Sequence, residues 1–486
     1  MSDNLRNKMF SGMFWTLLRQ TSLQMFSLVE GVILARLLSP SDYGLLAMPA
    51  FFMAISGCFI DSGFGSALVR KQDRKPIDYS TVFVTTVCMT AFFSILLCAC
   101  SPLIADFYNE PILIKIICAN AALLFLNSFL SIQNTRLTIK MDFKAQNLFR
   151  VITNITIGIT VIICAFCGMG VWAMVWPNFI MPFMNGYLYY RHDPWFPGFK
   201  FSWKVWREFF GYGSKLLVSN LITTTFDNIY PLVVGKKFSA SDLGYYSKAQ
   251  SYASLPSFTL QTVVGPVAFP VMCSISKDEQ RLQEAYQRLV ALTCYMTFPM
   301  IVGLAVLAEP FVMVLITSKW EAAIIYLQVL CFACMWNSFN VLSLDVFQVK
   351  GRSDLFLRLE IVKKMLSIVI LLVSIPFGLL IMCYGQVIAA NVSTFINVYY
   401  IKKVLGMGYW QQLKNILPSF FYAASMGIVV YFLLMFVKSY VLKLIVGFLI
   451  GVLYYFIISE ITKSSEWDYL KRLFKDKVLI ILKKSQ

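Results

Sequence analysis

The sequence predicts an all-α polytopic membrane protein with about fourteen transmembrane helices, arranged as two parallel six-helix repeats and one appended helix pair. Of its 486 residues, 58% are hydrophobic and only 14% are charged, whereas soluble domains carry about 25% charged residues. The apolar residues come in blocks of about 20, long enough for a helix to cross a bilayer. A membrane-spanning β-barrel would show short alternating strands instead.

An internal repeat is the further observation behind this fold class. The stretch LARLLSPSDYG at 34–44 returns in weaker form as VGKKFSASDLG at 234–244. Both copies contain Ser-x-Ser-Asp-x-Gly and join one apolar block to the next, so Asp42 and Asp242 are predicted to be helix N-caps. Because six predicted helices separate equivalent points, both copies insert in the same direction, as in transporters built from parallel repeats.

The predicted spans follow one another along the whole chain. They lie near 13–37, 44–66, 80–105, 112–134, 147–167, 171–190, 212–236, 245–272, 290–316, 321–349, 360–380, 384–404, 418–437 and 441–461. They group into an N-terminal bundle at 1–200, a C-terminal bundle at 201–404, an appended two-helix segment at 405–461 and a basic amphipathic tail at 462–486. Residues 199–210, residues 274–289 and the tail are predicted to be amphipathic helices in the headgroup plane.

Basic residues alternate between successive connections. The connections at 70–75, 136–150 and 350–364 are rich in Lys and Arg, as is the tail, whereas those on the other side carry few. Because the Lys/Arg-rich side is cytoplasmic, both termini are predicted to be cytoplasmic. The net charge of +17 then reflects contact with anionic lipid headgroups, and no nucleic-acid partner is expected.

The sequence gives no sign of a metal site, a cofactor or an enzyme. The two C-x-x-C pairs, at 164–167 and 331–334, fall inside apolar blocks, and the one histidine, His192, lies outside them. We interpret these cysteines as small residues for helix packing. A membrane enzyme acting on the same kind of substrate would need paired carboxylates or a metal site in a sizeable loop, and the outward loops are only a few residues long.

Six ionisable residues inside the predicted spans are the candidate site residues, because charges within a membrane are costly and usually face a polar cavity. They are Arg19 and Glu30 in the first span, Asp61 in the second, Lys215 and Asp227 in the seventh, and Asp345 in the tenth. Arg19 and Lys215 lie near the cytoplasmic ends of repeat-related spans, which predicts a shared cationic pocket for a phosphate or diphosphate. The alternative is that both side chains snorkel to the headgroups.

Several motifs resemble the polysaccharide-exporter branch of the multidrug/oligosaccharidyl-lipid/polysaccharide (MOP) superfamily. They are ILARLLSPSDYG at 33–44, DSGFGSALVR at 61–70, SKWE at 318–321 ahead of LQVL at 327–330, and KGRSD at 350–354. Their order and spacing are similar to those of the Wzx-type lipopolysaccharide and colanic-acid exporters. This resemblance extends over roughly residues 5–410.

The resemblance implies a V-shaped, alternating-access flippase of the bacterial inner membrane. Such a protein moves an oligosaccharide linked to undecaprenyl pyrophosphate, for lipopolysaccharide O-antigen, capsule or exopolysaccharide. It also implies basic residues in the central cavity, for which Arg19 and Lys215 are the candidates. A drug or metabolite antiporter of the same superfamily is the alternative. The energy source is open: the membrane potential, or H⁺ or Na⁺ bound by Glu30, Asp61 or Asp227.

Overall fold

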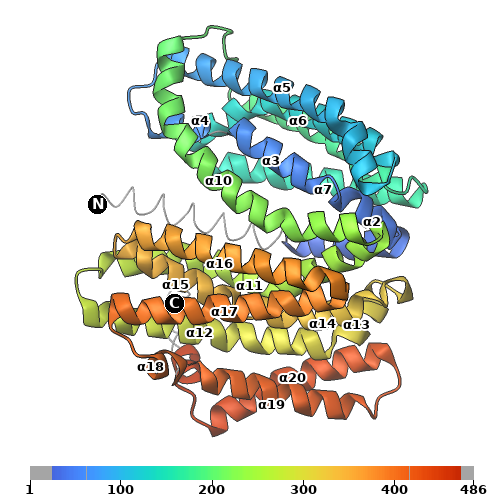
Figure 1. The fold of residues 1–486 in the computed structure, drawn as a ribbon, viewed down its shortest axis with the longest axis vertical. Coiled ribbons are helices and arrows are strands. Elements are labelled where there is room, and N and C mark those ends of the chain that lie inside the picture. The colour runs from blue at the N-terminus through green and yellow to red at the C-terminus, as the bar shows by residue number, and fades with distance from the viewer. Residues whose placement is uncertain (1–23, 62, 415, 472–486) are drawn as a thin grey trace, which may run out of the picture. The chain divides into compact units, whose positions relative to one another are not determined.

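The computed structural model describes residues 24–61, 63–414 and 416–471 (Figure 1). Within these residues the helices are joined by short connections, and no β-strand occurs. Its internal contacts divide the chain into two compact units, residues 1–247 and residues 248–486.

The first unit contains the helices up to α10, together with a helical segment at residues 24–37. These helices are α2 (Pro40–Ala47), α3 (Ala50–Asp61), α4 (Phe64–Arg70), α5 (Pro76–Tyr108), α6 (Ile112–Ile139), α7 (Phe143–Phe166), α8 (Trp172–Val175), the 3₁₀ helix η1 (Trp176–Phe179), α9 (Ile180–His192) and α10 (Trp203–Lys237). The long helices α5 and α6 pack side by side along their length (Figure 1).

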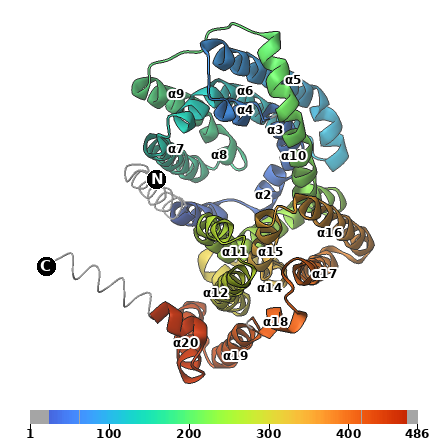
Figure 2. The same cartoon turned by 90° about the vertical axis from the view of Figure 1, so that its left-hand side faces the viewer.

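Helix α11 (Ala240–Ser274) begins in the first unit and continues in the second. The second unit then contains α12 (Glu279–Val306), α13 (Ala308–Leu315), η2 (Ser318–Trp320), α14 (Ala323–Cys334), α15 (Asn337–Val349), α16 (Ser353–Ser374), η3 (Ile375–Phe377), α17 (Leu379–Leu405), α18 (Tyr409–Lys414), α19 (Leu417–Leu434) and α20 (Tyr440–Ile461). Helices α19 and α20, the appended pair, pack against each other and against α12 and α13 (Figure 2).

The all-α, multi-span fold class is confirmed. Ten helices in the described part of the chain are long and apolar enough to cross a membrane. Each predicted span after the first falls on helix. Five of these spans are divided among two or more helices, namely 44–66, 171–190, 290–316, 321–349 and 360–380. The helices in spans 212–236 and 360–380, α10 and α16, are long enough to cross but are not among the ten. Polar residues lower the hydropathy of α10, and α16 carries the charged residues Arg358, Glu360, Lys363 and Lys364.

Two of the predicted headgroup-plane helices are instead the first turns of long helices. Residues 203–210 open α10, and residues 279–289 open α12 behind the N-cap Asp278. Some apolar side chains of these turns pack inward, since Phe209 is 2% exposed and Leu282 is fully buried, whereas Trp203 and Phe210 are exposed. The prediction of separate surface helices was therefore wrong for these two segments. Most of the predicted tail helix lies outside the described residues.

The two repeat motifs contact each other within the first unit. A methyl group built on Gly44 would lie 1.7 Å from the carbonyl oxygen of Ala240, and one built on Gly244 would lie 1.9 Å from that of Pro40. Pro40 and Ala240 are themselves equivalent positions of the repeat. The contact is therefore reciprocal, like a contact about a two-fold axis, and it requires glycine at both crossing points.

Each motif also builds the same helix start. Ser39 is the N-cap of α2, its Oγ accepts from the Asp42 backbone N at 3.2 Å, and the Asp42 carboxylate accepts from the Ser39 backbone N at 2.9 Å. Ser239 and Asp242 repeat this arrangement, with distances of 3.1 Å for both bonds. The capping residue is thus the serine, and the aspartate closes a capping box from the third helical position. This corrects the assignment of Asp42 and Asp242 as N-caps.

Candidate functional site

The side chains of the two predicted cations, Arg19 and Lys215, lie outside the described part of the structure. Arg19 lies outside the described residues. Lys215 lies on α10, but its side chain is also outside the described part of the structure. The cationic pocket formed by this pair therefore stays a prediction.

Helix α3, which ends at Asp61, runs antiparallel beside α10, which carries Lys215 (Figure 2). At one end of this contact, Sγ of Cys58 lies 3.0 Å from Oγ1 of Thr224. At the other end, a methyl group built on Gly63 would lie 3.0 Å from Cα of Gly213. Gly63 has a φ of +70°, a left-handed conformation that glycine adopts readily.

The contact with α10 lies close in sequence to two of the predicted site residues, Asp61 and Lys215. The methyl position on Gly63 is also 3.1 Å from Cδ1 of Leu216, the residue after Lys215. Gly63, two residues after Asp61, therefore contacts α10 at Gly213 and Leu216, on either side of Lys215. Asp227 lies further along α10 and is exposed.

Glu30 lies at a contact between helices. It belongs to the helical segment at 24–37, and its Oε2 would lie 3.1 Å from a methyl group built on Gly158 of α7. Further along the same segment, Leu34 and Leu38 pack with Ile157 and Val161 of α7 in one hydrophobic cluster. The Glu30 carboxylate thus lies against α7, within the first unit.

Asp345 lies on α15 in the second unit, where it is half-buried. The five predicted residues of the first unit and Asp345 therefore belong to different units. Within the first unit, Gly63, two residues after Asp61, contacts Gly213 and Leu216 of α10, which lie on either side of Lys215.

A buried cation in the second unit was missed by sequence reasoning. Lys363 lies inside α16 and is only 7% exposed. Its Nζ donates to Oδ1 of Asn397 on α17 at 3.3 Å and forms an ion pair with Glu360, one turn earlier on α16. Asn397, fully buried, donates in turn to Oδ1 of Asn340 on α15 at 2.8 Å. A continuous polar chain therefore connects α15, α16 and α17.

The sequence contained a signal for this network. Glu360 and Lys363 both fall inside the predicted span 360–380, three residues apart and so on one helix face. The charge pattern instead places Lys363 in the cytoplasmic connection 350–364, because this lysine lies close to the predicted end of the span. The partner Asn397 lies in the neighbouring predicted span, 384–404.

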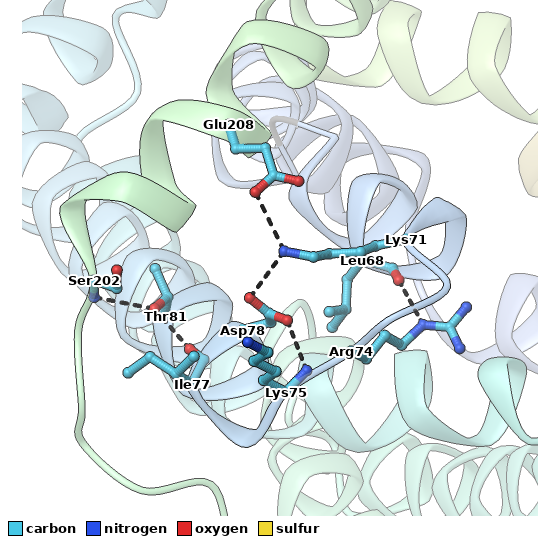
Figure 3. A network of polar contacts seen from close by, with 9 residues as sticks. All are labelled: Leu68, Lys71, Arg74, Lys75, Ile77, Asp78, Thr81, Ser202 and Glu208. Atoms are coloured by element: carbon cyan, nitrogen blue, oxygen red, sulfur yellow. Dashed lines mark hydrogen bonds and ion pairs between the residues drawn. The ribbon is translucent and has the colours of Figure 1, made fainter.

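A second polar cluster fixes the start of α10 to the loop between α4 and α5 (Figure 3). Nζ of Lys71 lies 3.2 Å from Oδ1 of Asp78 and 3.2 Å from Oε2 of Glu208 on α10. Asp78 is 1% exposed and also accepts from the Lys75 backbone N at 2.7 Å. Burial lowers the pKa of Lys71, but its hydrogen bonds to Asp78 and Glu208 raise that pKa more, so the net shift is upward.

Two further bonds in this cluster hold the chain just before α10 and the end of α4. The Ser202 backbone N donates to Oγ1 of Thr81 at 3.1 Å, and Nε of Arg74 donates to the Leu68 carbonyl at 2.9 Å (Figure 3). The first of these bonds places the start of α10 against α5. The second satisfies a carbonyl that the end of α4 leaves without a helical partner.

Neither cluster offers a metal site, and no group of three or more His, Cys, Asp or Glu side chains suited to a metal occurs among the residues described.

The helical fold and its internal repeat define the class of protein, a multi-span membrane protein with the fold of alternating-access transporters. The solved structure of the lipid II flippase MurJ, inward closed conformation, aligns with a TM-score of 0.75 and 17% identity, over 92% of this chain and 98% of that chain. An inward-facing multidrug resistance MATE family transporter of the MOP superfamily aligns with a TM-score of 0.63 and 13% identity, over 79% of this chain and 95% of that chain.

Residues 33–325 match the family of polysaccharide biosynthesis proteins, and the chain belongs to this family. The teichuronic acid biosynthesis protein TuaB of Bacillus subtilis (strain 168) is 22% identical over 431 residues, covering 88% of this chain and 89% of that protein. The lipopolysaccharide biosynthesis protein WzxC of Escherichia coli (strain K12) is 23% identical over 449 residues, with the same coverage. The predicted resemblance is confirmed.

Proposed function

We propose that this protein is a flippase that moves undecaprenyl-pyrophosphate-linked oligosaccharide across the bacterial inner membrane for surface polysaccharide biosynthesis. The observation that carries the proposal is the combination of family and fold: the chain belongs to the polysaccharide biosynthesis proteins and has the fold of a lipid II flippase over nearly its whole length. It acts as a transporter rather than as an enzyme, with both termini in the cytoplasm and with bundles at 1–200 and 201–404.

In this proposal Arg19 and Lys215 bind the substrate diphosphate near the cytoplasmic ends of their helices, while the polyprenyl tail stays in the bilayer. Arginine binds phosphate oxygens in a bidentate manner, and lysine adds a point charge. Gly63, two residues after Asp61, contacts Gly213 and Leu216 on either side of Lys215, which supports a role for Asp61 in setting the charge near Lys215. Outward movement of each negative charge gains about 2.3 kcal/mol per 100 mV of inside-negative potential, and H⁺ or Na⁺ coupling through Glu30, Asp61 or Asp227 is the other possible source of energy.

Substitution of the two cations tests the proposal. We expect Arg19→Ala and Lys215→Ala each to abolish surface polysaccharide and to accumulate a lipid-linked intermediate on the inner leaflet, at unchanged protein level. Lys204→Ala is the matched control, because Lys204 lies exposed near the start of α10. Arg19→Lys should be milder than Arg19→Ala if charge matters more than bidentate geometry. Normal polysaccharide in both alanine variants would remove the cationic pocket from the mechanism.

The second candidate function is a cation-coupled antiporter of drugs or metabolites. The observation that favours it is the alignment with the MATE family transporter. A deletion strain discriminates between the two functions. The flippase predicts loss of surface polysaccharide with unchanged drug tolerance, and the antiporter predicts drug sensitivity with unchanged polysaccharide.

A further inference from the structure

The second unit contains a cavity of about 730 Å³ between α12 and α13, α14, α17, and the appended pair α19–α20. Most of its lining is apolar, including Phe332 of α14 and Met435 at the end of α19. Met435 is 60% exposed and Tyr431, also in the lining, is 54% exposed, so the cavity opens on the outer surface of the molecule. Its size and its mostly apolar lining with a few polar groups are typical of small-molecule sites.

One end of the cavity carries both signs of charge. Glu309 lies in the first turn of α13 and Lys443 in the first turn of α20, and both line the cavity. The hydroxyl of Tyr440 donates to Oε1 of Glu309 at 3.2 Å, and Nζ of Lys443 lies 5.5 Å from the centre of the Tyr440 ring. A single tyrosine therefore holds the carboxylate and the ammonium close to each other.

The position of Tyr440 on α20 indicates how deep in the membrane the charged end of the cavity lies. Tyr440 is the first residue of α20, a helix of 22 residues that is long and apolar enough to cross the membrane. Tyrosines at the ends of such helices lie at the level of the lipid headgroups. Glu309, hydrogen-bonded to Tyr440, lies at the same level, and the apolar wall of the cavity extends from there toward the acyl chains.

We propose that this cavity is a binding site for a phospholipid with a zwitterionic ethanolamine headgroup. The ammonium of the headgroup binds the Glu309 carboxylate by a charge-assisted hydrogen bond, and the phosphate binds Lys443. An acyl chain occupies the apolar wall lined by Phe332 of α14 and Val387 of α17. The bound lipid connects the appended helix pair to α12, α14 and α17. This site is separate from the binding of the transported substrate.

The charges select this headgroup over the other common ones. An anionic glycerol headgroup offers no cation to the Glu309 carboxylate. A choline headgroup has the positive charge but no N–H group to donate a hydrogen bond to the carboxylate. The expected order of affinity is therefore ethanolamine, then choline, then glycerol.

Native mass spectrometry of the full-length protein in detergent tests the order of affinity directly. The protein is titrated separately with phosphatidylethanolamine, phosphatidylcholine, phosphatidylglycerol and undecaprenyl phosphate. We expect phosphatidylethanolamine to bind about tenfold more tightly than phosphatidylglycerol, the difference typical of one hydrogen bond to a charged group. Equal binding of these two lipids overturns the proposal. Displacement of bound phosphatidylethanolamine by undecaprenyl phosphate also overturns it, because the cavity then belongs to the polyprenyl tail.

Substitutions in the cavity test whether phosphatidylethanolamine binds there. Glu309→Gln and Lys443→Gln should each weaken phosphatidylethanolamine binding by about tenfold, whereas Lys438→Gln, an exposed lysine in the same α19–α20 loop, should leave it unchanged. Unchanged binding in both cavity variants contradicts the assignment. Surface polysaccharide is measured in the same strains. Loss of lipid binding with normal export supports the lipid site and leaves the proposed function standing. Loss of export with normal lipid binding concerns the transport mechanism alone.

Discussion

Gly44 and Gly244 occupy the tightest contact between the two repeat motifs. At each position the obstacle to a side chain is a backbone carbonyl, of Ala240 or of Pro40, which cannot rotate away as a side chain would. Ordinary core positions accept a small change of volume by moving neighbouring side chains, and overpacking costs about 1–3 kcal/mol when they cannot. The cost here is expected at the upper end of this range.

We therefore predict that Gly44→Ala and Gly244→Ala each lower the thermal unfolding midpoint in detergent. Gly265→Ala is the control, because a methyl group on Gly265 of α11 meets no atom within 4 Å. An alanine there should be neutral or stabilising by up to about 1 kcal/mol. Equal melting of all three variants and the wild type would show that the contact contributes nothing to stability.

The buried ion pair of α16 gives a second prediction for single residues. Glu360→Gln leaves the ammonium of Lys363, whose side chain is 8% exposed, without its counter-charge. Removing one partner of a buried ion pair lowers the free energy of unfolding by about 3–5 kcal/mol, whereas removing both charges lowers it much less. The double variant Glu360→Gln/Lys363→Met should thus be more stable than Glu360→Gln alone, as measured by melting in detergent. A double variant less stable than the single one would contradict this account.

Lys363 also shows where sequence reasoning fails for single side chains. The ends of predicted spans are uncertain by about one helical turn, and Lys363 lies one turn from such an end. That uncertainty decides whether a lysine is assigned to a hydrated loop or to a buried helix face. By contrast, the repeat itself was visible in the sequence, since equivalent glycines follow equivalent capping residues. The sequence alone did not show that the two motifs touch.

At the scale of helices, the position of α10 depends on the cluster around Lys71. The ammonium connects the loop after α4 to Asp78 of α5 and Glu208 of α10. Its pKa is raised above the ordinary value of 10.5 by these hydrogen bonds, which outweigh the opposite effect of burial. A raised lysine pKa means that the stabilisation is complete below the ordinary pKa and is lost as the pH rises through the higher, folded-state value.

Lys71→Met should consequently lower the unfolding midpoint at neutral pH, and the variant and the wild type should converge as the pH rises above 10.5. Melting curves in detergent between neutral and strongly alkaline pH measure this difference. Lys204→Met, an exposed lysine on α10, serves as the control and should follow the wild type at every pH. A constant difference between Lys71→Met and the wild type would assign the effect to lost packing rather than to charge.

The helices themselves were largely predictable, because apolar blocks of membrane-spanning length are a strong signal. Their interruptions were harder to predict. The predicted span 44–66 is divided into α2, α3 and α4, with Pro49 between the first two and Gly63 between the last two. Pro299, inside α12, interrupts nothing. Whether a proline ends a helix depends on the packing around it, which a single sequence does not contain.

For the whole molecule, the distribution of basic residues predicts the orientation in the membrane. The connection that contains Lys402, Lys403 and Lys414 is expected in the cytoplasm, and the short loop between α19 and α20 on the other side. Alkaline phosphatase, which is active only outside the cytoplasm, should therefore be active when fused after Lys438 and inactive when fused after Lys414. The reverse pattern would invert the topology and place the predicted diphosphate site on the wrong side.

The reciprocal contact of the two motifs has a consequence for the ancestry of the chain. Position 40 meets 244, and position 240 meets 44, which is the pattern that two identical half-length polypeptides form in a symmetric homodimer. In a homodimeric ancestor of that kind, one mutation would change both sides of the contact at once. In this chain a mutation changes only one side, because proline stands at position 40 and alanine at position 240, while glycine stands at both 44 and 244.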